Sequence, residues 1–160
     1  MAYPIKFKHF NETSILIEWP ALIDKKMLKN ILFFKKSIET NYAKQRVEVV
    51  STYNSLCVIY GYTIEDVNSE FFLLKSLYLD LVEPQENKIK IWNVPVCYDD
   101  EFAPDLKSFS KAKNLSKTEI IKLHTNPIYN IFFIGFLPGF LYLGGLDSQL
   151  YLDRKRTPDL

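Results

Sequence analysis

The chain has 160 residues, of which 48% are hydrophobic and 24% are charged, and its formal net charge is +1. This hydrophobic content is ordinary for a globular protein and excludes an intrinsically disordered chain. The small net charge excludes a bulk electrostatic attraction to nucleic acid or to an anionic membrane. The longest apolar runs, such as Ile131–Ile134, are far shorter than the ~20 residues of a membrane span, and residues 1–10 lack the apolar core of a secretory signal. We therefore expect a soluble, cytoplasmic protein.

The first third of the chain predicts two strands and a helix. Residues 6–10 and 14–19 favour β structure on either side of a polar turn at residues 11–13. A helix is expected from about Asp24. Its buried face is predicted by apolar residues at helical spacing, namely Ile23, Met27, Ile31, Phe34 and Ile38. The lysines between them indicate a solvated opposite face.

A second group of strands and a helix follows. Residues 47–51 and 56–60 are rich in β-branched residues and predict strands, and Thr63 is a candidate N-cap for the next helix. The buried face of that helix is predicted at Ile64, Val67, Phe71, Leu74, Tyr78 and Leu81, with the helix ending at Glu83-Pro84. Residues 88–92 suggest a further strand. The order of elements indicates a split-βαβ, α+β sandwich in residues 1–84, with both helices on one face of an antiparallel sheet.

The composition changes after residues 85–87, which are the predicted domain boundary. Pro104 suits the first position of a short helix, and Ser116 with Glu119 forms a capping box that opens another helix running to His124. Residues 104–126 also imitate a DNA-binding helix-turn-helix. That alternative is weak, because the second helix carries no arginine and the chain has almost no net positive charge.

Four of the five glycines lie close together, at positions 135, 139, 144 and 145, after a predicted strand at residues 129–136. The segment lacks the spacing of a phosphate-binding or dinucleotide-binding loop, so ATP binding does not follow from any standard motif. Two interpretations remain open from spacing alone. The segment is either an Ω-loop packed by its own aromatic side chains or a binding platform with an apolar floor and exposed backbone amides.

Residues suited to catalysis or metal binding are few. Of the two histidines, His9 is expected to be structural, and His124 lies at a helix C-terminus, where capping is the simplest role. His124 is a candidate acid or base only if the fold brings it beside the glycine segment. Cys57 and Cys97 lie in apolar runs and are expected to be buried, reduced thiols. No metal-binding spacing and no nucleophile–base pair is visible in the sequence.

Several motifs together resemble a known family. Residues 11–19 are similar to an opening G-E-x-A-L-x-V-E-F pattern, and residues 53–58 to Y-N-S-L-x-V. Residues 104–106, 115–116 and 123–124 resemble P-D-L, L-S and L-H elements. Residues 135–143 match G-F-x-P-G-F-x-Y-L at every fixed position. On these motifs the chain resembles the KipI/PxpB family, also known as allophanate hydrolase subunit 1 or carboxyltransferase subdomain C/D.

The resemblance implies an N-terminal α+β domain, residues 1–84, and a C-terminal cyclophilin-like β-barrel domain, residues 85–160. The family continues into further strands beyond the position of Leu160, so only the first part of the barrel is expected here. The family also has Arg where this chain has Asp159 and often Pro where it has Asp153.

The resemblance also implies a function. PxpB-type members are subunits of a bacterial 5-oxoprolinase that uses ATP to open 5-oxoproline to glutamate together with PxpA- and PxpC-type subunits. We expect such a subunit, inactive alone, with ATP bound only in the complex and with neither nucleic acid nor membrane as a partner. The alternative is a KipI-type inhibitor of a sensor histidine kinase, which has the same motifs.

A site for a small carboxylate substrate is expected around the glycine segment. The predicted substrate-binding residues are Gly135, Phe136, Pro138, Gly139, Phe140, Tyr142, Arg154 and Arg156, and no metal ligands are predicted. A pocket with an apolar floor and one or two cations is typical of sites for small anions, and Arg binds carboxylates bidentately. His124 is the candidate catalytic residue.

Overall fold

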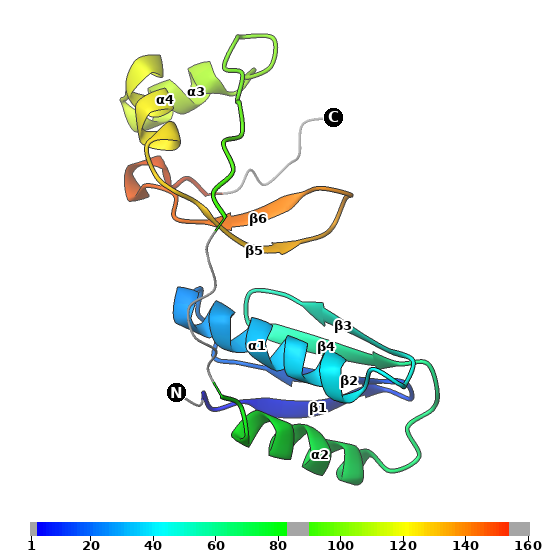
Figure 1. Cartoon of the computed structure of the whole chain (residues 1–160). Helices are drawn as coiled ribbons and strands as arrows, with labels where there is room; N and C mark the ends of the chain where they lie inside the picture. The colour runs from blue at the N-terminus through cyan, green and yellow to red at the C-terminus, as the bar shows by residue number, and fades with distance from the viewer. Residues whose placement is uncertain (1–2, 83–89, 154–160) are drawn as a thin grey trace. The chain divides into compact units, whose positions relative to one another are not determined.

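The structure is a computed structural model that describes residues 3–82 and 90–153 (Figure 1). The chain divides into two compact units. Unit 1 combines the described residues up to 82 with residues 132–142, and unit 2 contains residues 90–131 and 143–153. The architecture is α+β with antiparallel sheets, as predicted. The predicted boundary at residues 85–87 lies outside the described residues, so the division into 1–84 and 85–160 stays a prediction.

Unit 1 is built on a four-stranded antiparallel sheet. Its strands are β1 (Lys6–Asn11), β2 (Ser14–Glu18), β3 (Val47–Ser51) and β4 (Ser55–Tyr60), in the order β1-β2-β4-β3. Ile15 pairs with Val58 and Ile17 with Leu56, so the buried residues of β2 and β4 share one face of the sheet. The four strands confirm the prediction. The further strand expected at residues 88–92 is absent over residues 90–92, and residues 88 and 89 lie outside the described part.

Helix α1 (Lys25–Asn41) covers the inner face of the sheet (Figure 1). It begins where predicted, because the Asp24 side chain accepts a hydrogen bond from the Met27 backbone N–H at 2.8 Å. Four of the five predicted face residues are buried: Met27, Ile31, Phe34 and Ile38. Ile23 was wrongly included. It precedes the N-cap, so the helical period does not apply to it and its side chain is exposed.

Helix α2 (Val67–Leu79) packs into the same core and buries Leu74 and Tyr78. Both helices therefore lie against one face of the sheet, as predicted. The N-cap is Asp66 rather than Thr63, because the Asp66 carboxylate accepts hydrogen bonds from two backbone amides of the first turn. The helix ends at Leu79, and the predicted stop at residues 83–84 lies outside the described residues.

An aromatic cluster joins the two helices to the sheet. Trp19, Phe34 and Tyr78 make edge-to-face contacts, with ring centroids 5.1–6.1 Å apart. The Trp19 indole N–H and the Tyr78 hydroxyl both donate to the side-chain oxygen of Asn30, at 2.8 and 3.0 Å. The core thus contains polar groups, but these have hydrogen-bond partners and do not incur the cost of unpaired burial.

Unit 2 contains helices α3 (Leu106–Lys113) and α4 (Lys117–Thr125) and a short 3₁₀ turn, η1 (Ser148–Leu150). Helix α3 starts two residues later than expected, because Asp105 occupies the N-cap and Pro104 precedes it. The predicted capping box of α4 is present, since Ser116 and Glu119 satisfy each other's backbone N–H groups. The barrel-like fold expected for this part of the chain is not tested by these elements and stays a prediction.

In the glycine segment, residues 135–140 form the loop of a β-hairpin. Strand β5 (Asn130–Ile134), which confirms the strand predicted at residues 129–136, pairs with β6 (Leu141–Gly144), a strand that was not predicted. The two cysteines are free, as expected, but their predicted burial was wrong: Cys57 is half-buried and Cys97 is exposed. Among residues 3–82 and 90–153, no helix is long and apolar enough to cross a membrane, and no group of three acidic, His or Cys residues is arranged to hold a metal ion.

Candidate functional site

The capping box of α4 fixes the position of His124 in the last turn of that helix. The Tyr129 hydroxyl donates to the backbone carbonyl of His124 at 2.8 Å, so this tyrosine caps a carbonyl that the helix leaves unpaired. The imidazole ring is engaged elsewhere. Its Nδ1 lies 2.5 Å from the Tyr98 hydroxyl, and its face contacts the ring of Tyr129. His124 thus lies in the last turn of α4, as expected, and Tyr129 caps its backbone carbonyl.

The Tyr98–His124 pair has a preferred arrangement of protons. Burial raises the pKa of the Tyr98 hydroxyl, so the phenol keeps its proton near neutral pH. When this phenol donates to Nδ1, a neutral imidazole carries its proton on Nε2. His124 is held by two tyrosines in a defined orientation, with Nε2 as the ring atom suited to exchange a proton with a ligand.

A cavity of about 430 Å³ lies beside this pair, within unit 2. Its lining is mainly apolar: Tyr98, Phe102, Ala103, Pro104, Asp105, Leu106, Phe109, Ile120, His124, Leu146 and Leu150. The cavity is wide open to solvent, and its apolar lining with a few convergent polar groups is a feature that it shares with small-molecule sites. The motif residues 104–106 and His124, which carried part of the family resemblance, meet here although 18 residues or more separate them in the sequence.

The described lining does not suit a triphosphate. No lysine or arginine is among these lining residues, and the Asp105 carboxylate would repel phosphate oxygens. A small carboxylate likewise finds no cation among them. Arg154 and Arg156, the predicted carboxylate partners, lie outside the described residues.

The predicted substrate-binding residues at the glycine segment belong to the β5–β6 hairpin in unit 1, not to the unit that holds His124. Of the wider segment 135–146, only Leu146 is among the residues that line the cavity. The backbone N–H groups of Gly135, Leu137 and Phe140 donate to carbonyls within the hairpin tip, so these amides are already paired. Gly139 has the positive φ that its turn position suggests, +78°. The assignment of these residues to a substrate site stays a prediction.

The hairpin tip has an unusual backbone. Phe136 has φ of +67°, a left-handed conformation that a bulky residue rarely adopts, and its side chain is exposed. Tyr142 stacks on Phe133 with ring centroids 3.9 Å apart, and Phe140 contacts Tyr142 edge-on. The aromatic residues of the hairpin therefore pack on one another, as the first of the two interpretations of this segment expected.

Tyr98 and the phenylalanines of the cavity were missed in the sequence. Tyr98 is 26 residues from His124, and no local pattern links them. Only the resemblance of residues 104–106 and 123–124 to family motifs pointed to this region.

A family model described as "Carboxyltransferase domain, subdomain C and D" matches residues 5–160 of the chain. The chain belongs to this family. The resemblance to the KipI/PxpB family rested on short motifs, and the family model confirms it over almost the whole length of the chain.

Three relatives are each named as the B subunit of 5-oxoprolinase. The protein from Bacillus subtilis (strain 168) is 33% identical over 122 residues, which cover 70% of this chain and 51% of the relative. The protein from Haemophilus influenzae is 28% identical over 148 residues, covering 92% of this chain and 68% of the relative. The protein from Escherichia coli O157:H7 is 37% identical over 81 residues, which cover 51% of this chain and 36% of the relative. The chain thus spans about half the length of the Bacillus relative.

A crystal structure of TTHA0988 has a similar fold. It superposes with a TM-score of 0.73 at 21% identity, over 90% of this chain and 28% of that protein. At this identity the likeness concerns the fold alone.

Proposed function

We propose that this subdomain C and D chain acts as the B-type subunit of an ATP-dependent 5-oxoprolinase, which opens 5-oxoproline to glutamate together with PxpA- and PxpC-type subunits. The observation that supports this most strongly is the family membership, together with the shared name of the three relatives. In this proposal the chain is a hydrolase subunit without activity of its own. By family resemblance ATP is a co-substrate that binds only in the complex.

Within the complex we assign a proton-transfer role to His124. Opening a lactam breaks a C–N bond, and the departing nitrogen needs a proton. The His124 ring is oriented by Tyr98 and Tyr129, and His124 is one of the residues that line the cavity, which suits it to supply that proton. The predicted substrate residues Tyr142 and Arg154 remain part of the proposal. So do the split-βαβ arrangement of residues 1–84 and the cyclophilin-like arrangement of residues 85–160.

Reconstitution tests the proposed function. The purified chain, mixed with cognate A- and C-type subunits, 5-oxoproline and ATP, is expected to release glutamate, whereas the chain alone and the partners without it are not. Full activity of the partners without this chain would contradict the proposal. Inhibition of the autophosphorylation of a sensor kinase, with no contribution to glutamate release, would support the KipI-type role instead.

Single variants in the reconstituted complex test the residue roles. His124→Ala, Tyr142→Phe and Arg154→Ala are expected to lose activity at a nearly unchanged melting temperature. Lys36→Ala on the exposed face of α1 is the control and should keep full activity. If the three site variants all retain the activity of the unmodified chain, the site assignment is wrong.

A further inference from the structure

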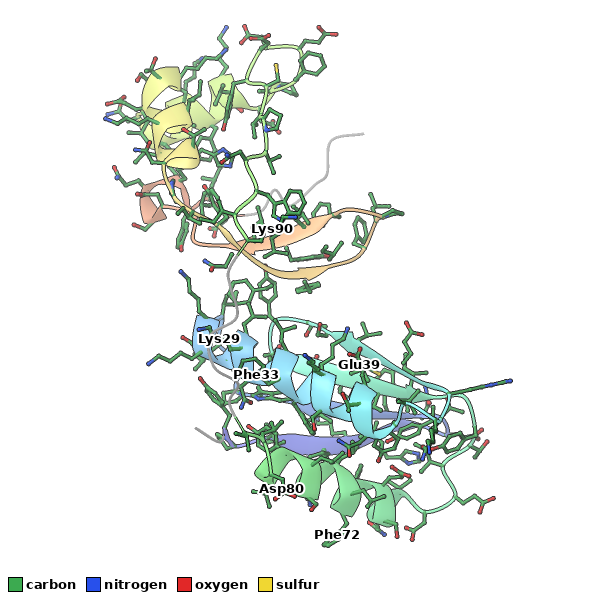
Figure 2. The ribbon with its side chains drawn as sticks, in the orientation of Figure 1. Lys29, Phe33, Glu39, Phe72, Asp80 and Lys90 are labelled. Atoms are coloured by element: carbon green, nitrogen blue, oxygen red, sulfur yellow. The ribbon has the colours of Figure 1, made fainter. Side chains whose placement is uncertain are left out.

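Helix α2 has two apolar faces. Eight of its 13 residues are apolar, and only Leu74 and Tyr78 are fully buried in the core of unit 1. On the opposite side Phe72 is 72% exposed and Leu79 is 76% exposed, and Figure 2 shows Phe72 pointing away from the rest of unit 1. Large apolar side chains that gather on an exposed face commonly mark an interaction surface. The outer side of α1 differs, because lysines such as Lys29 occupy it (Figure 2).

The outer residues of α2 have the spacing of a helix-packing seam. Ser69, Phe72, Ser76 and Leu79 follow one another at intervals of three, four and three residues, the a/d pattern of paired helices. No charged residue lies within this seam. Lys75 and Asp80 stand at its margins, with opposite charges. An uncharged centre with a charged rim is the usual composition of a protein–protein interface.

We propose that a second copy of this chain packs antiparallel against this face of α2, with the two-fold axis level with Leu74. For every pair of residues that face each other across this axis, the sum of the two residue numbers is the same. Phe72 then faces Ser76 of the second copy, and Leu79 faces its Ser69. Each layer of the seam combines one large and one small side chain, which fills the space evenly. A parallel pair would instead place Phe72 on Phe72 and Ser76 on Ser76.

Electrostatics also favour the antiparallel arrangement. Each helix carries a partial positive charge at its N-terminus and a partial negative charge at its C-terminus. In the proposed pair, the C-terminal end of each α2 lies beside the N-terminal turn of the other. The termini that meet therefore have opposite partial charges.

The size of the face indicates a weak dimer. If a side chain of this size exposes roughly 150–200 Å² when free, the exposed fractions of Phe72, Leu73 and Leu79 amount to about 350 Å² of apolar surface per copy. A helix of 13 residues is about 20 Å long, which limits what the polar rim can add. For both copies this apolar surface amounts to about 700 Å², which is below the roughly 1,200 Å² at which stable specific interfaces begin and falls in the range of weak, transient contacts. We expect reversible association with a Kd roughly in the micromolar range.

Sedimentation velocity of the full chain over a range of concentrations tests the dimer and its register. The unmodified chain is expected to show a monomer–dimer equilibrium. Phe72→Ser leaves a gap and Ser76→Phe creates a clash, so each should weaken association by about tenfold or more. The double variant Phe72→Ser/Ser76→Phe restores the large–small layers only in the proposed register, and it should regain dimerisation. Leu32→Glu on the outer side of α1 is the control and should dimerise normally.

Three results would overturn the proposal. The chain could be a monomer at every concentration, the single variants could dimerise as strongly as the unmodified chain, or the double variant could fail to restore the dimerisation that the single variants lose. A chain that stays monomeric but loses binding of a partner subunit on Phe72→Ser would assign the face to that subunit instead. Circular dichroism checks that each variant is folded. The exchange Leu79→Ser/Ser69→Leu repeats the test in the second layer if the first pair disturbs folding. The readout is oligomeric state, so the result is independent of whether the reconstituted complex turns over 5-oxoproline.

Discussion

The carboxylate of Glu70 is predicted to be a main polar support of unit 1. Its Oε2 accepts hydrogen bonds from the Tyr42 hydroxyl at 2.9 Å and the Tyr60 hydroxyl at 3.2 Å. These tyrosines come from the end of α1 and from β4 and are only 6% and 2% exposed. Glu70 thus ties α2 to both elements. Glu70→Ala leaves two buried hydroxyl groups without their acceptor.

The expected loss follows from the cost of an unsatisfied buried group. Each such group costs about 1–3 kcal/mol, and partial access of water to the Glu70 position favours the lower value. We therefore expect Glu70→Ala to lower the free energy of unfolding by about 2–3 kcal/mol. Glu70→Gln keeps an acceptor oxygen but loses the charge, and should cost about 1 kcal/mol. Glu39→Ala, which removes a solvent-exposed carboxylate on α1, should change stability by less than about 0.5 kcal/mol.

Urea unfolding followed by tryptophan fluorescence measures these values. Trp19 lies in the core of unit 1, so a Trp92→Phe background makes the signal specific for that unit. Tyr60→Phe should also cost less in the Glu70→Ala background than in the unmodified chain, because its hydrogen bond is already lost. A Glu70→Ala loss below about 0.5 kcal/mol, or equal Tyr60→Phe costs in both backgrounds, would refute the proposed role of Glu70.

Three further predictions concern pH, helix capping and backbone conformation. Burial raises the pKa of Tyr42 and Tyr60 above the ordinary 10, so their contribution is complete below pH 10 and is lost as the pH rises toward the folded-state values. Unfolding free energy should fall by about 1.4 kcal/mol per tyrosine by pH 11, and Tyr60→Phe should reduce that fall in urea titrations. Ser116→Ala should destabilise α4 by about 1 kcal/mol, seen as faster amide exchange in its first turn. Hydrogen bonds from Ser116 lower the pKa of Glu119. The stability that the capping box contributes is therefore present above the ordinary carboxyl pKa and is lost as the pH falls through the lowered value. If Ser116→Ala cost as much stability in acid as at neutral pH, this reasoning would be contradicted. Gly139→Ala should cost about 1 kcal/mol or more from its positive φ alone, since no atom lies within 4 Å of the added Cβ, and Gly139→Asn should cost less in thermal unfolding.

Local sequence determined most of unit 1 and the start of α4. Alternation in β2, the apolar stripe of α1 and the Ser116–Glu119 box are all set by residues within a few positions of each other. Such local patterns predict the same helix or strand in any fold that buries one face of that element. Errors arose at the ends of elements. Thr63 and Asp66 are both able to cap a helix, and in the structure the Asp66 carboxylate accepts the backbone N–H groups of the first turn.

Tertiary structure alone decided the features that depend on distant partners. Strand β6 has only four residues, Leu141–Gly144, and lies between glycines, so its sequence gives a weak strand signal; it forms a strand because β5 supplies its hydrogen bonds. The Tyr98–His124 pair and its cavity exist because the chain folds back over 26 residues. The spacing of apolar residues in α2 likewise shows that the helix is apolar. It does not show which side of the helix the sheet covers, so the exposed seam could not be predicted. Pairing and burial are properties of the whole chain, and a local pattern therefore cannot specify them.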